Sequence, residues 1–93
     1  MLSSKEIEKK LSKAASLCQE GKLDEAKNIY EDLILICPSN SDVLTNLGTI
    51  KLNFGRLDEA EALLNSSISI LRDPLAINNL ATVYIRQKNT KRH

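Results

Sequence analysis

The chain has 93 residues and nearly balanced charge, and it is 42% hydrophobic but only 3% aromatic. That length suits one domain over residues 1–93, with a thin core that must be built from Leu, Ile and Ala. A net charge of +1 gives no electrostatic reason to expect nucleic acid or an anionic membrane as a partner. No apolar run approaches the roughly 20 residues of a membrane span, and the N-terminus lacks the apolar stretch of a signal peptide, so a cytoplasmic location is expected.

The first two helices are marked by their ends. Ser3-x-x-Glu6 is a capping box, which predicts a helix that runs to about residue 20 and ends at Gly21. A second helix is expected from about residue 23, with acidic residues at its positive N-terminal end. It stops before Pro38, because proline disfavours a helical conformation in the residue before it.

The remaining signals predict three more helices. Asn40 or Ser41 caps the third helix, and Gly55 ends it. A fourth helix follows with another acidic first turn. Asp73-Pro74 supplies an N-cap and a proline at the first helical position, which starts a fifth helix running to about residue 89. With no strand signal, the expected fold is all-α, with five antiparallel helices.

One six-residue sequence segment occurs twice. Gly21-Lys-Leu-Asp-Glu-Ala26 returns 34 residues later as Gly55-Arg-Leu-Asp-Glu-Ala60. A fixed period of roughly 20 to 50 residues marks a repeat architecture, in which each unit buries its apolar face against the next. The small residues Ala26 and Ala60, and the matching set Ala14, Gly48 and Ala81, are expected to let paired helices approach closely.

This pattern resembles the tetratricopeptide repeat, a 34-residue helix-turn-helix. The resemblance is carried by Ala26, Tyr30 and Pro38, by Leu47-Gly48 and Ala60, and by Leu80-Ala81 and Tyr84. It implies one repeat at about residues 7–40, a second at about 41–73, a partial repeat or capping helix at about 74–89, and a basic tail at 90–93. The chain departs from the pattern where Lys10 and Lys13 replace apolar residues and where Lys51 replaces a tyrosine.

The resemblance implies a protein-interaction module. Peptides or helices would bind in a concave groove lined by the first helix of each repeat. The expected groove residues are Leu11, Ala15, Thr45, Asn46, Thr49, Leu52, Asn78, Asn79, Thr82 and Ile85.

Asn46 and Asn79 resemble the asparagine ladder of the O-GlcNAc transferase superhelix and of kinesin light chains. In those families the asparagine side-chain amide forms hydrogen bonds with the backbone of an extended peptide, because it supplies both donors and an acceptor. The alternative is that the two asparagines bind neighbouring helices or water. Recognition of a terminal carboxylate, as in chaperone-binding repeats, is not expected, since only Asn46 matches that set and the cations are missing.

Catalysis is not expected from these residues. There is no nucleophile–base pair, no glycine-rich phosphate loop and no metal-ligand cluster, so no cofactor or metal is expected. Cys18 and Cys37 are too far apart for a redox or zinc pair and are interpreted as structural, and His93 is the only histidine. Two alternatives stay open: a self-assembling structural repeat unit, and a regulatory N-terminal segment of a larger enzyme such as a repeat-bearing glycosyltransferase.

The fifth predicted helix carries more apolar residues than one packed face needs. Val83 and Ile85 are therefore expected to remain exposed and to form a contact between copies, through a two-fold interface or exchange of that helix.

Overall fold

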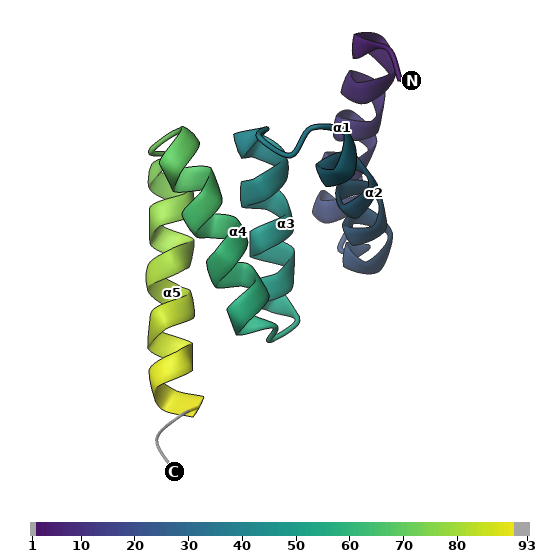
Figure 1. The fold of residues 1–93 in the computed structure, drawn as a ribbon. Coiled ribbons are helices and arrows are strands. Elements are labelled where there is room, and N and C mark those ends of the chain that lie inside the picture. Colours follow the sequence, from purple (N-terminus) through teal and green to yellow (C-terminus); the bar gives the residue numbers. More distant parts are fainter. Residues whose placement is uncertain (1, 91–93) are drawn as a thin grey trace.

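The computed structural model describes residues 2–90, which form five helices joined by short turns (Figure 1). They are α1 (Ser4–Gln19), α2 (Leu23–Ile36), α3 (Ser41–Asn53), α4 (Leu57–Ile70) and α5 (Pro74–Thr90). Successive helices run in opposite directions, and no strand occurs among residues 2–90. The prediction of an all-α fold with five helices is confirmed. Apart from Thr90, the predicted basic tail lies outside the described residues.

Side-chain caps begin three of the helices where the sequence predicts them. The Glu6 amide donates to Ser3 Oγ at 3.3 Å, and the Ser3 hydroxyl donates to the Glu6 carboxylate at the same distance. Asn40, rather than Ser41, caps α3 by accepting from the Val43 amide at 3.1 Å. Asp73 accepts from the amide of Leu75 at 3.0 Å and so starts α5. These bonds satisfy amides that have no partner within the helix.

The two glycine turns are built alike. Gly21 and Gly55 have φ angles of 79° and 76°, in the left-handed region that suits glycine. After Gly21, the Lys22 amide donates to the Leu17 carbonyl at 2.8 Å, and the Arg56 amide makes the equivalent bond to Lys51 at 2.9 Å. This arrangement is the Schellman motif. It reverses the chain within each helical hairpin.

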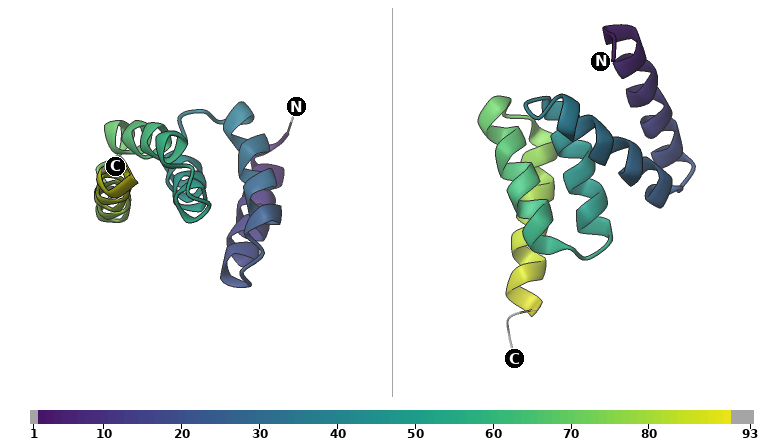
Figure 2. Two further views of the ribbon diagram at one scale, coloured as in Figure 1. Left: turned by 90° about the horizontal axis from the view of Figure 1, so that it is seen from below. Right: turned by 45° about the vertical axis from the view of Figure 1, so that its right-hand side comes forward.

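The helices stack in sequence order. Figure 2 shows α1 and α2 at one end of the molecule and α5 at the other, with α4 lying across α3 and α5. One core cluster joins α1, α2 and α3 around residues such as Leu17, Tyr30 and Leu33, and a second joins α3, α4 and α5 around Leu64. Both cores are aliphatic apart from Tyr30.

Small residues allow the close helix contacts that the sequence predicts, with one exception. Ala14, Ala26 and Ala60 are fully buried. A Cβ atom added to Gly48 would lie 2.9 Å from Leu64 Cγ, so α3 and α4 meet there with no room for a side chain. Ala81 at the matching place in α5 is exposed, because no helix of residues 2–90 covers that side of α5.

Three predicted surface residues are buried, so those predictions are wrong. The Thr45 hydroxyl lies 2.5 Å from Ser67 Oγ, which in turn donates to the Ser41 carbonyl at 3.1 Å. Leu52 packs in the cluster around Leu64. Val83 belongs to the same cluster, because it shares the face of α5 that turns toward α4.

Candidate functional site

A hollow of about 250 Å³ opens between α1 and α3. Its lining includes three predicted groove residues, Leu11, Ala15 and Asn46, together with Ser12, Tyr30 and Asp42. Leu11 and Ala15 follow one another by one turn of α1, and Asp42 and Asn46 do so on α3, so each helix contributes two side chains at the same spacing. The structure therefore brings these predicted residues together from separate repeats.

Tyr30 reaches this hollow from α2 and is almost completely buried. Burial raises the pKa of its hydroxyl, nearby Cys18 and Asp42 add to the rise, and a hydrogen bond with Asn46 opposes it. The phenol is therefore neutral at physiological pH. A hydroxyl and an amide lie beside the apolar side chains of Leu11 and Ala15, and both groups can donate and accept hydrogen bonds.

Asn79, like Asn46, bonds a side chain of another helix, but it does not line the hollow. Its amide nitrogen donates to Thr49 Oγ1 at 2.7 Å, and Thr49 donates to the Thr45 carbonyl at 2.8 Å. This is the alternative in which the asparagine binds a neighbouring helix. The bond ties α5 to α3 and leaves Asn79 with fewer free donors for a ligand.

The other predicted groove residues of α5 do not extend the hollow. Thr82 donates to the Asn78 carbonyl of its own helix at 3.2 Å. Asn78 and Ile85 are exposed, the latter by 62%, and neither lines the hollow between α1 and α3. The predicted row is thus divided into a hollow between α1 and α3 and an interhelix hydrogen-bond chain between α3 and α5.

Ser12, Tyr30 and Asp42 line the hollow but are not among the predicted groove residues. Tyr30 was noted only as part of the repeat pattern, and its length lets it reach the hollow from the second helix of the repeat. Asp42 lies one turn before Asn46, so helical spacing alone predicts that the two share a face. Asp42 is the only ionisable carboxylate in the lining.

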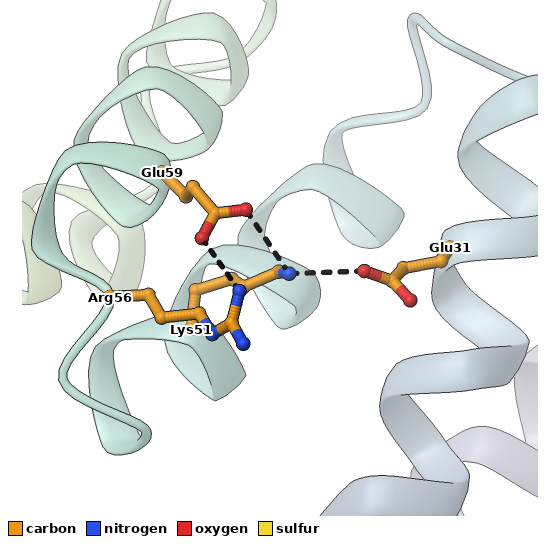
Figure 3. A network of polar contacts seen from close by, with 4 residues as sticks. All are labelled: Glu31, Lys51, Arg56 and Glu59. Atoms are coloured by element: carbon orange, nitrogen blue, oxygen red, sulfur yellow. Dashed lines mark hydrogen bonds and ion pairs between the residues drawn. The ribbon is translucent and has the colours of Figure 1, made fainter.

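A second concave surface lies on α2, α3 and α4, and we call it the α2–α4 cleft. Its volume is about 490 Å³, and it is lined by Glu31, Ile34, Leu35, Leu47, Lys51, Glu59, Ala62 and Leu63. Figure 3 shows Lys51 extending from α3 between Glu31 of α2 and Glu59 of α4. Lys51 Nζ lies 3.0 Å from one carboxylate and 3.3 Å from the other, and only 5% of the residue is exposed.

This ion-pair network joins three helices. Arg56 adds a contact of 3.3 Å to Glu59, which therefore has two cationic partners. In the sequence, Lys51 was noted only as a departure from the repeat pattern, where it replaces a tyrosine. Its burial is possible because two carboxylates compensate its charge.

The chain matches the sequence profile of the tetratricopeptide repeat over residues 17–81, and it belongs to this family. Tetratricopeptide repeats generally mediate protein–protein interaction and are typically non-catalytic modules. No match to the chain was found among curated proteins.

Residues 2–90 contain no group of three or more His, Cys, Asp or Glu side chains that could hold a metal ion. Within the same residues, no helix has both the length and the apolar character needed to cross a membrane.

The network around Glu59 predicts a pH-dependent contribution to stability. Hydrogen bonds from Arg56 and Lys51 hold the pKa of Glu59 below its ordinary value. A depressed pKa stabilises the fold above the unfolded-state pKa, about 4.3 for glutamate, and this stabilisation is lost as the pH falls through the folded-state pKa. Glu59→Gln should therefore be less stable than wild type at pH 7, and the difference should shrink below about pH 4.

Thermal melts between pH 3 and pH 7 test this expectation. Glu8→Gln, which alters an exposed carboxylate on α1, is the matched control and should follow wild type more closely. A difference between Glu59→Gln and wild type that is constant across this range would contradict the expectation.

Proposed function

We propose that the chain is a protein-interaction module that binds an extended peptide segment in the hollow between α1 and α3. The observation that carries this proposal is the convergence of Leu11 and Ala15 from one repeat with Asn46 from the next, above the Tyr30 hydroxyl. The proposal includes the cytoplasmic location expected from the sequence, where thiols such as Cys18 stay reduced.

The chemistry of the lining indicates the class of ligand. The Asn46 amide, which the buried Tyr30 hydroxyl holds by a hydrogen bond, pairs with uncharged backbone N–H and C=O groups, and Leu11 and Ala15 accept a small apolar side chain. No cation lines the hollow, so it does not favour a terminal carboxylate. Because only one carboxylate is present, binding should depend weakly on salt.

A displayed library of random linear peptides, selected on the wild-type chain, supplies the test ligand. Ala15→Arg should weaken the selected peptide by tenfold or more, since an exposed alanine in the hollow is replaced by a side chain that fills it. Asn46→Ala should weaken it about twofold to tenfold, because a hydrogen bond contributes about 0.5–1.5 kcal/mol. Asn79 is not a suitable test position, because it does not line the hollow.

Ser16→Arg is the matched control, because Ser16 is exposed on the same helix and does not line the hollow. Titration by isothermal calorimetry should give wild-type affinity for this variant. Equal affinities for Ala15→Arg and wild type, in a folded variant, would place the binding surface elsewhere.

A further inference from the structure

A second hollow on α1 adjoins the proposed peptide site. Its volume is about 380 Å³, and it is lined by Lys5, Glu8, Lys9 and Ser12, all of them exposed. Ser12 also lines the hollow between α1 and α3, so the two hollows meet at this residue. We call the second one the lysine hollow.

We propose that the lysine hollow binds an acidic side chain of the same peptide, about three residues away from the small apolar residue that enters the first hollow. This inference rests on the proposed peptide site and specifies the class of sequence that the site takes. The small apolar side chain lies against Leu11 and Ala15, and the carboxylate lies beside the ammonium groups of Lys5 and Lys9.

The arrangement of the helices gives the peptide this path. Helices α1 and α3 run in the same direction, and the N-terminal end of α1 extends beyond the start of α3 (Figure 1). A peptide that leaves the hollow between α1 and α3 at that end therefore continues along α1, where it passes Lys9 and then Lys5. Both lysines are exposed, so no helix of residues 2–90 covers this path.

The distance between the two contacts fixes the spacing in the peptide. Lys9 precedes Ala15 by six residues, which is about 9 Å along an α-helix at roughly 1.5 Å per residue. An extended peptide covers about 3.3 Å per residue, so about three of its residues span this length. Lys5 lies one turn beyond Lys9, so both ammonium groups can turn toward one carboxylate.

The positive charge of the lysine hollow is available to a ligand. Lys5 and Lys9 form no ion pair within residues 2–90, whereas Lys51 in the α2–α4 cleft already bonds two carboxylates. Glu8 offsets one of the two positive charges in the lining, and a net positive charge remains. An anionic side chain is therefore favoured here, through an interaction that salt weakens.

Asp42 restricts where the peptide's carboxylate can lie. It lines the hollow between α1 and α3, and no cation does so. A carboxylate directly beside the small apolar residue would meet this like charge, which disfavours it, whereas a carboxylate further along α1 meets the lysines. The two hollows therefore select an acidic residue by its position in the peptide as well as by its charge.

Peptides selected on the wild-type chain from the random library test the inference. Amidation of their C-termini ensures that no terminal carboxylate contributes. The selected sequences should share an acidic residue about three positions from a small apolar one. Replacing the acidic residue by its amide analogue should weaken binding about threefold to tenfold in isothermal calorimetry. Moving it next to the apolar residue should weaken binding at least as much.

Salt provides a second readout with the same two peptides. The amide peptide should keep the weak salt dependence expected for the hollow between α1 and α3 alone. The acidic peptide should lose affinity as the salt concentration rises, because its contact with the lysines is exposed to solvent. The same salt dependence for both peptides would contradict the inference.

Lys9→Glu tests the contact from the side of the protein. It should weaken the acidic peptide about threefold to tenfold, and replacing the peptide's acidic residue by lysine should recover most of this loss. Lys13→Glu is the matched control, because Lys13 is exposed on the same helix and lines neither hollow. It should bind the acidic peptide like wild type. Circular dichroism establishes that both variants are folded.

The outcomes separate this inference from the proposed function. If Ala15→Arg abolishes binding while Lys9→Glu has no larger effect than Lys13→Glu, the peptide site stands and the acidic preference is wrong. Selected peptides that share no acidic residue would overturn the inference in the same way. Equal affinities for Ala15→Arg and wild type would overturn both the peptide site and the acidic preference.

Discussion

Ala14→Leu and Ala60→Leu should each lower the free energy of unfolding by about 1–3 kcal/mol, because added side-chain volume in a packed core forces the helices apart. Both alanines are fully buried where paired helices meet. Leucine is also a good helix former, so the loss cannot be attributed to helix propensity. Chemical denaturation followed by circular dichroism measures the effect.

Ala81→Leu is the matched control, since Ala81 occupies the same repeat position as Ala14 but is exposed. Its effect should stay within about 0.5 kcal/mol, as for most surface substitutions. If all three variants unfolded at the wild-type denaturant concentration, close helix packing would not be what requires small residues at positions 14 and 60. If Ala81→Leu were as destabilising as Ala14→Leu, the face of α5 that carries Ala81 would be packed against another part of the protein and not exposed.

Ser67→Ala should cost about 1–3 kcal/mol, because it leaves buried polar groups without their partner. The Ser67 hydroxyl donates to the Ser41 carbonyl and lies against the Thr45 hydroxyl, so one side chain joins α4 to both the start and the middle of α3. The exposed neighbour Ser66 provides the control, and Ser66→Ala should be close to neutral.

A double variant separates hydrogen bonding from packing. Thr45→Val removes the second hydroxyl and nearly preserves side-chain shape, so Thr45→Val combined with Ser67→Ala should be less destabilising than the sum of the single changes. Strictly additive losses in the denaturation experiment would indicate that the two hydroxyls act independently.

Features encoded locally could be predicted from the sequence. The caps at Ser3, Asn40 and Asp73 and the glycine turns depend on a few neighbouring residues, and the structure has them where they were expected. The repeated sequence segment also predicts that Ala26 and Ala60 are buried, because each repeat places its alanine against the same kind of neighbour.

The faces of the helices were harder to assign. Val83 was expected at the surface, yet Ala76, Leu80, Val83 and Gln87 follow one another at helical spacing and form the face packed on α4. Thr45 and Leu52 fit the groove by repeat position, but the rotation of α3 turns them into the core. Each residue turns a helix by about 100°, so small differences in rotation decide which side chains are exposed.

Long side chains account for the rest of what the sequence did not reveal. Lys51 reaches between Glu31 and Glu59, which come from two other helices and from separate repeats. Tyr30 likewise reaches the hollow between α1 and α3 from α2. Such contacts depend on how repeats stack, which a spacing rule within one helix does not describe.

Binding in the hollow between α1 and α3 is tested most directly by nuclear magnetic resonance shift mapping with a peptide selected from the random library. The ¹⁵N-labelled chain should show its largest shift changes at the Ala15 backbone amide and at the backbone and side-chain amides of Asn46. Shift changes confined to the α2–α4 cleft or to α5, with the amides of Ala15 and Asn46 unaffected, would contradict the proposed site.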